Sequence, residues 1–180
     1  MKRVLFLLPA LLLAVLAGFA VWALLFSDRN LQVPPSALIS KPAPLLAGPL
    51  LMEGESIQVT LDLEQNKDVK LVNFFASYCV PCVHEHPQLL ALARRDDTST
   101  FGVTFNDKTP DALRFLERLG DPFDSVLDDA TSGLAIEWGV SAIPTTFVVN
   151  TEGQIIYRHD GPINPAELSD LEAIIERAKS

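Results

Sequence analysis

Cysteine is scarce in this chain: only Cys79 and Cys82 occur among its 180 residues. The usual structural zinc site needs a second pair of ligands, and His84 and His86, two residues apart on a helix, would point in different directions. Covalent haem attachment requires a histidine directly after a C-x-x-C motif, where this chain has Val83. We therefore expect no metal site and no bound cofactor, and we expect both histidines to be ordinary surface or helix-turn residues.

Basic residues are also few, with 14 lysines and arginines against 23 acidic residues and a net charge of −9. Lys2 and Arg3 lie at the extreme N-terminus, so the rest of the chain carries 12 basic and 23 acidic residues and a net charge of −11. This balance argues against nucleic acid as a partner and indicates that most charges keep the protein in solution.

Charge is absent altogether from residues 4–26. These 23 residues, at ~1.5 Å each in a helix, can span the ~30 Å hydrocarbon layer of a membrane. We predict one transmembrane helix, with Lys2 and Arg3 in the cytoplasm and the rest of the chain on the far side. A cleaved signal peptide with a small-residue site at 18–20 is the alternative, but the apolar stretch continues to Phe26, which favours a retained anchor.

The chain is expected to have three parts. Residues 1–29 would form the cytoplasmic N-terminus and the anchor, residues 30–44 a proline-rich tether, and residues 45–180 one folded domain. A domain of this length can bury its own core.

The hydrophobic pattern predicts alternating strands and helices. A strand–helix–strand order comes first and a hairpin with a helix comes last, which builds an α/β fold, a thioredoxin-like mixed sheet flanked by helices. In this arrangement Ile143-Pro144 enters the first hairpin strand, where a cis proline can lie beside the helix start that carries Cys79. The predicted strands cover residues 57–63, 69–76, 100–105, 145–150 and 154–159. The predicted helices run from the cysteine motif to residue 93 and cover residues 110–119, 130–138 and 165–178.

Two thiols as close as those of Cys79 and Cys82 form a reversible two-electron switch. At the start of a helix, the first thiol lies among unpaired N–H groups and at the positive end of the helix dipole, which favours the thiolate. We predict Cys79 as the nucleophile and Cys82, one turn further and facing the core, as the resolving thiol. A static disulfide is the alternative, but its loop is too small to constrain the unfolded chain much.

From residue 36 to its end, the chain resembles the thioredoxin superfamily and, within it, the membrane-anchored CcmG/DsbE proteins of bacterial cytochrome c maturation. The matches are dense and extend well beyond the C-x-x-C motif. They cover residues 41–44, 72–82, 85–87, 102–103, 115–123, 138–140, 143–147 and 153–162.

This resemblance implies an inner-membrane protein with a periplasmic domain that acts as a thiol-disulfide oxidoreductase in the reducing direction. It would receive electrons from a membrane donor of the CcdA/DsbD type and pass them to a disulfide of apocytochrome c or of a CcmH-like partner. It also implies a cis Pro144, an extended substrate segment paired with the backbone beside Ile143, and no cofactor beyond the disulfide of the two cysteines. The substrate-binding residues expected on this basis are Tyr78, Pro81, Ile143, Pro144 and Thr145.

Three positions depart from the related sequences. Tyr78 replaces the usual tryptophan, a mild exchange, and Thr145 replaces the glutamate that usually follows the cis proline, which leaves a broader reductase of the TlpA or ResA type open. Asn73 stands where thioredoxins commonly have a buried aspartate, and its amide cannot act as a base. Glu85, three residues after Cys82 on the same helix, is the candidate proton acceptor, and the alternative is an acid placed in the first turn on the helix dipole.

Two other functions stay open. A copper- or haem-delivering chaperone would use the cysteines as metal ligands, and an oxidase would insert disulfides instead of reducing them. Among the other residues, Trp138 is expected in the core, Gly139-Val140 is expected to shape the substrate groove, and His159 is expected to be a polar residue at a strand end.

Overall fold

The computed structural model describes residues 12–19, 22, 38–52, 54, 57–61, 63 and 68–179. The chain divides into two compact units, Met1–Pro35 and Ser36–Ser180. In the first unit, residues 12–19 are helical. No helix within the described part of the chain has the length and apolar character needed to cross a bilayer. Most of the membrane segment predicted at residues 4–26 lies outside the described residues.

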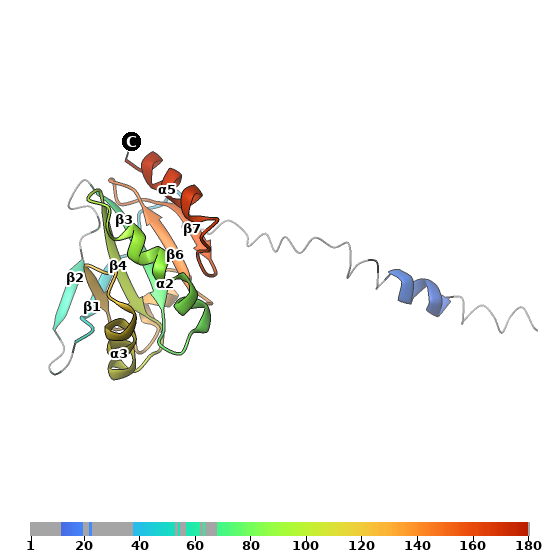
Figure 1. The fold of residues 1–180 in the computed structure, drawn as a ribbon, viewed down its shortest axis with the longest axis horizontal. Helices are drawn as coiled ribbons and strands as arrows, with labels where there is room; N and C mark the ends of the chain where they lie inside the picture. The colour runs from blue at the N-terminus through green and yellow to red at the C-terminus, as the bar shows by residue number, and fades with distance from the viewer. Residues whose placement is uncertain are drawn as a thin grey trace, which may run out of the picture. The chain divides into compact units, whose positions relative to one another are not determined.

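The described part of the second unit contains two sheets and the helices that pack on them (Figure 1). Its strands are β1 (Leu46–Pro49), β2 (Gln58–Leu61), β3 (Val69–Phe75), β4 (Thr98–Thr104), β5 (Ser125–Leu127), β6 (Thr145–Val149) and β7 (Ile155–Asp160). Its helices are α2 (Val80–Leu92), α3 (Thr109–Leu119), α4 (Gly133–Glu137) and α5 (Leu168–Arg177). The larger sheet has the order β5-β4-β3-β6-β7, and β1 pairs with β2 in the smaller one.

The larger sheet is mixed, as the order of elements predicted. β3 pairs in parallel with β4, and β4 in parallel with β5. β6 is antiparallel to both β3 and β7. The parallel part comes from the strand–helix–strand units and the antiparallel part from the hairpin, because a short turn can join only antiparallel strands.

The central strand β3 is buried along its whole length, which explains its nearly continuous apolar sequence. Its successive side chains face opposite sides of the sheet. On one side Leu71 packs in a cluster with Leu89 of α2 and with residues of α5. On the other side Phe74 packs against Trp138 and Phe147. The sheet is therefore covered on both faces, and the prediction that Trp138 lies in the core is confirmed.

The predicted strands and helices are all present, with ends shifted by up to three residues. Two strands were not predicted. β5 has only three residues, too few for a periodic pattern to be recognised. β1 contains Gly48 and Pro49, residue types that usually mark loops, and its pairing with β2 is what makes it a strand.

The folded unit begins earlier than residue 45. Residues 38–44 lie against the β6–β7 hairpin, where Ser40 N–H donates to Ile155 O at 2.7 Å and Ala43 N–H donates to Gly153 O at 2.8 Å. Ile155 N–H donates in return to Lys41 O at 3.0 Å. The last part of the predicted tether therefore belongs to the domain, because these backbone groups find partners on the hairpin. The rest of that tether, residues 30–37, lies outside the described residues.

Candidate active site

Cys79 and Cys82 are joined by a disulfide, with their Cα atoms 5.3 Å apart. Cys79 is the N-cap of α2 and has extended backbone angles, φ −87° and ψ 104°. Its Sγ accepts a hydrogen bond from Cys82 N–H at 3.2 Å. Pro81 fits the first turn because the N–H that it lacks would have no partner inside the helix. The first cysteine thus lies at the N-terminus of a helix, as predicted.

The cysteines lie beside a partly exposed apolar surface. Cys79 is 6% exposed and Cys82 2%, whereas the neighbouring Tyr78 and Val80 are 60% and 65% exposed. Ile143 packs against the cluster that contains both cysteines, and the Ile143–Pro144 peptide bond is cis, as expected. The structure therefore brings the predicted residues of the cysteine motif and of the cis-proline loop to one end of the sheet.

Thr145 is fully buried, in contrast to Tyr78. Its Oγ1 lies 2.9 Å from Ala142 O and 3.0 Å from Asp160 Oδ1, two acceptors for one hydroxyl proton. Asp160 also forms an ion pair with Arg158, whose Nη1 donates to Gly139 O at 3.1 Å. This network ties the loop before the cis proline to β7. The side chain of Thr145 therefore positions the loop, and the expected direct contact with substrate is not available to it in this structure.

Glu85 lies in the second turn of α2 and has no exposed surface. Its Oε1 accepts from Asn73 Nδ2 at 2.9 Å, and its Oε2 accepts from Ile163 N–H at 3.1 Å. Burial raises the pKa of the Glu85 carboxyl to about 7, although both hydrogen bonds act in the opposite direction. The first turn of α2 contains no acidic residue, so the alternative of an acid placed there on the helix dipole is wrong.

The amide of Asn73 can form a hydrogen bond with the Glu85 carboxyl whether that carboxyl is ionised or neutral. Its Nδ2 donates to the Glu85 carboxylate and lies 3.0 Å from Thr146 Oγ1. Its Oδ1 is buried and has no hydrogen-bond partner among the described residues. A half-turn of the amide would present this oxygen as an acceptor for the proton of a neutral carboxylic acid. An aspartate at this position would instead place a second acid beside Glu85.

The two histidines of α2 have different environments. His84 is exposed, as expected. His86 is only 3% exposed, and its Nε2 lies 2.7 Å from Gly120 O, to which it donates. Its ring is also perpendicular to the ring of Phe115, with 5.2 Å between the centroids. The expectation of a surface residue is therefore wrong for His86, because it points from α2 toward α3 and the loop that follows.

Asp107 was not predicted, and it holds the loop that leads to the cysteines. Its Oδ2 accepts from Ser77 N–H at 2.5 Å, and its Oδ1 accepts from Ser77 Oγ at 2.9 Å. Ser77 comes two residues before Cys79. Because β3 and β4 are parallel, their carboxyl ends meet at the same edge of the sheet. The sequence signal that could have identified Asp107 is an acidic residue soon after the end of β4.

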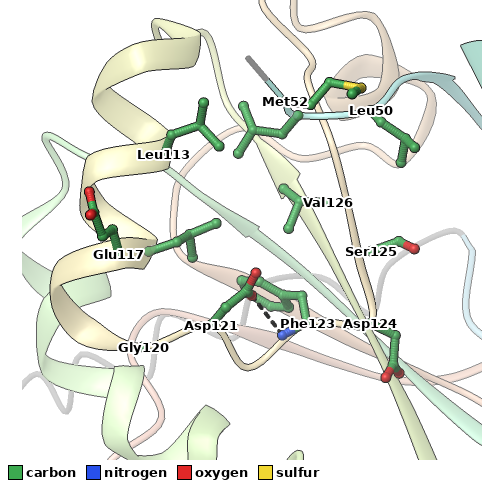
Figure 2. Close-up of a pocket in the computed structure, with 12 residues that line it drawn as sticks. Leu50, Met52, Leu113, Glu117, Gly120, Asp121, Phe123, Asp124, Ser125 and Val126 are labelled. Atoms are coloured by element: carbon green, nitrogen blue, oxygen red, sulfur yellow. Dashed lines mark hydrogen bonds between the residues drawn. The ribbon is translucent and has the colours of Figure 1, made fainter. Parts of the chain in front are cut away.

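A separate groove of about 640 Å³ lies between α3 and β5 (Figure 2). Figure 2 shows Leu113 and Glu117 of α3 across from Ser125 and Val126 of β5. None of the predicted site residues is among those that line this groove. Val126 also belongs to the apolar cluster that contains the cysteines. The groove therefore shares Leu116 and Val126 with the apolar cluster that contains the cysteines.

Comparison with known proteins agrees with this geometry. The Redoxin family model matches residues 39–175. A thiol:disulfide interchange protein DsbE homolog of Paracoccus denitrificans is 41% identical over 157 residues, 87% of this chain and 84% of that protein. The thiol:disulfide interchange protein HelX of Rhodobacter capsulatus is 37% identical over 164 residues, 91% of this chain and 90% of that protein.

Solved structures share the fold. A crystal structure of a thiol:disulfide interchange protein of the thioredoxin family from Chlorobium tepidum has a TM-score of 0.62 at 23% identity, covering 77% of this chain and 96% of that one. The thioredoxin-like fold is thereby confirmed. With its Cys-x-x-Cys disulfide at a helix N-terminus, the chain belongs to the Redoxin family and, within it, to the thiol:disulfide interchange proteins of the DsbE/CcmG type.

Proposed function

We propose that this protein is a membrane-anchored periplasmic reductant that opens disulfides of apocytochrome c, or of a CcmH-like partner, during cytochrome c maturation. Membership of the DsbE/CcmG type supports the cytochrome c role. The observation that supports this chemistry is the complete burial of Glu85, which raises the pKa of its carboxyl to about 7. It lies three residues after Cys82 on α2, and such residues share one face of a helix.

The reaction begins at Cys79. Its thiolate attacks a sulfur of the substrate disulfide, a mixed disulfide forms, and one substrate thiolate leaves with the electron pair of the broken bond. The sulfur of Cys82 then attacks Cys79, its proton passes to the Glu85 carboxylate, and the second substrate thiolate leaves. The substrate has gained two electrons, and the protein keeps the disulfide. An electron donor of the CcdA/DsbD type returns two electrons, and Glu85 returns the proton to Cys82.

The N-terminus of α2 and the carboxyl of Glu85 have different roles in this reaction. The unpaired N–H groups of the first turn favour the Cys79 thiolate, and no acidic residue lies there to oppose them. An acid that titrates near neutral pH is well matched to accept and return a proton at the working pH. The acceptor and donor groups of Asn73 fit both states of that acid.

The exposed surface of Tyr78 and Val80 suits contact with a polypeptide substrate. Ile143 and the cis Pro144 would lie beside an extended segment of that substrate. The uncharged residues 4–26, preceded by Lys2 and Arg3, would anchor the chain in the inner membrane with its domain in the periplasm.

The reduction potential of the Cys79/Cys82 pair tests the direction of the reaction. A value near that of thioredoxin, about −270 mV, is expected for a reductant. A value near the ~−120 mV of a strong oxidant would make the protein a disulfide donor and refute the proposal.

A Cys82→Ser variant tests the substrate, because it cannot resolve the mixed disulfide and should trap it. The matched probes are two oxidised peptides of equal length, one carrying the haem-binding C-x-x-C-H sequence and one with this histidine replaced. Preferential trapping of the first peptide is expected. Equal trapping would favour a general reductase of the TlpA or ResA type, to which Thr145 at the position of the usual glutamate also points.

A further inference from the structure

The peptide group between Pro162 and Ile163 contacts two titratable side chains. Its N–H donates to Glu85 Oε2 at 3.1 Å, and its carbonyl oxygen lies 3.4 Å from His159 Nε2. A carbonyl oxygen only accepts, so Nε2 of the imidazole carries the proton in this contact. The imidazole nitrogen and the carboxylate oxygen are therefore within about 9 Å of each other, joined by one polar peptide unit.

The sheet register independently puts His159 on the face where Glu85 lies. Asn73 of β3 is paired with Thr146 of β6, and Thr146 is paired with His159 of β7. Side chains of directly paired residues project to the same face of a sheet. Asn73 binds Glu85 and contacts Thr146, so a polar row crosses this face from the buried acid toward β7.

The other side of His159 reaches solvent. A cavity of about 130 Å³ is lined by Tyr157, His159, Ile163, Glu167, Asp170 and Leu171. This volume holds a few waters at ~30 Å³ each. The imidazole Nε2 is 3.9 Å from Glu167 Oε2, and the Glu167 side chain is 45% exposed. His159 thus lies between the fully buried Glu85 and the solvent.

We infer that His159 is a positioning residue that tunes how readily Glu85 takes the proton of Cys82, acting through the Pro162–Ile163 peptide group. A proton on the imidazole polarises this peptide, strengthens its N–H as a donor and brings a positive charge near the carboxylate. Both effects favour the ionised, proton-accepting form of Glu85. The inference rests on the proposed role of Glu85 as proton acceptor.

Other titratable groups surround the pair. Tyr157, Glu167 and Asp170 face the imidazole from β7, from the turn before α5 and from α5, and Cys82 lies beside Glu85 on α2. Glu167 and Asp170 therefore place negative charge on the cavity side of the imidazole.

The resolving step can be followed with the reduced full-length chain and dithiobis(nitrobenzoate), an aromatic disulfide that releases a coloured thiolate at each step. The first phase reports attack by Cys79 and the second reports resolution by Cys82. The rate of the second phase should rise with pH as Glu85 ionises. His159→Gln should move the midpoint of this rise upward by about one pH unit, with the first phase unchanged. His159→Lys keeps a positive charge and should leave the midpoint at or below that of the wild type.

Two controls separate the possible failures. His84→Gln changes an exposed histidine on α2 and should reproduce the wild-type profile. If Glu85→Gln also keeps that profile, the proposed role of Glu85 is wrong and the inference on His159 fails with it. If Glu85→Gln abolishes the pH dependence but His159→Gln matches the wild type, only the inference on His159 is overturned. Equal shifts in His159→Gln and His159→Lys would also overturn it, because they would report packing and not charge.

Discussion

Raising the pH from 5 to 8 should destabilise the oxidised domain through Glu85. Burial raises the pKa of this carboxyl from its ordinary value of 4.5 to about 7 in the folded protein. Between these two values the folded state keeps a proton that the unfolded state has released, so the free energy of unfolding falls as the pH rises. The stabilisation by the neutral acid is complete below pH 4.5 and is lost as the pH rises through 7.

The expected size follows from the shift of the pKa. Each pKa unit corresponds to about 1.4 kcal/mol, so the shift from 4.5 to about 7 is equivalent to about 3 kcal/mol over the whole titration. About 2–3 kcal/mol of this change falls between pH 5 and pH 8, because the unfolded carboxyl is already mostly ionised at pH 5. Glu85→Gln removes this titration. Its amide can still accept from Ile163 N–H and can donate to Asn73 Oδ1, which has no partner in the described part of the chain.

Urea unfolding of the oxidised domain Ser36–Ser180 at both pH values measures the effect. The wild type should lose about 2–3 kcal/mol more than Glu85→Gln on going from pH 5 to pH 8. Comparing the two proteins cancels the contributions of groups that they share. An equal loss in both proteins would show that the buried carboxyl titrates normally, and it would remove the physical basis of its role as a proton acceptor at neutral pH.

Two further substitutions test the packing around the site. Asp107→Ala should destabilise the domain by about 1–3 kcal/mol in urea unfolding, because Ser77 N–H and Oγ lose their acceptors. An unchanged midpoint of urea unfolding would mean that this contact does not hold the loop. Gly102→Ala should cost about 1–3 kcal/mol, because a Cβ there would lie 2.9 Å from the ring of Phe123. Gly48→Ala is its control, since the nearest atom would be at 3.7 Å, and equal losses in both variants would contradict the steric explanation.

Features that depend on neighbours in sequence could be predicted. The buried strand β3 is recognisable from its continuous apolar residues, and the start of α2 from the cysteine motif with Pro81. The cis Pro144 came from the resemblance to known proteins, because no local rule distinguishes it from other prolines. Short elements such as β5 were missed because three residues carry too little pattern.

Contacts between distant parts of the chain could not be predicted in the same way. Glu85 meets Ile163, 78 residues later, and Asn73 meets Thr146, 73 residues later. The sequence indicated Glu85 as a candidate, but whether it is buried or exposed depends on these partners. His86 was wrongly expected at the surface for the same reason, since nothing near it in sequence predicted its contact with Gly120.

The sequence by itself determined the chemistry of this protein: two cysteines at the spacing of a reversible disulfide, placed where a buried strand gives way to a helix. Only the tertiary structure decided how that chemistry is controlled. Packing of α2 against the sheet removes Glu85 from water and raises its pKa, and the sheet register brings Asn73, Thr146 and His159 into one row. The physical reason is that covalent spacing is local, whereas desolvation and hydrogen bonding depend on every element that packs around a group.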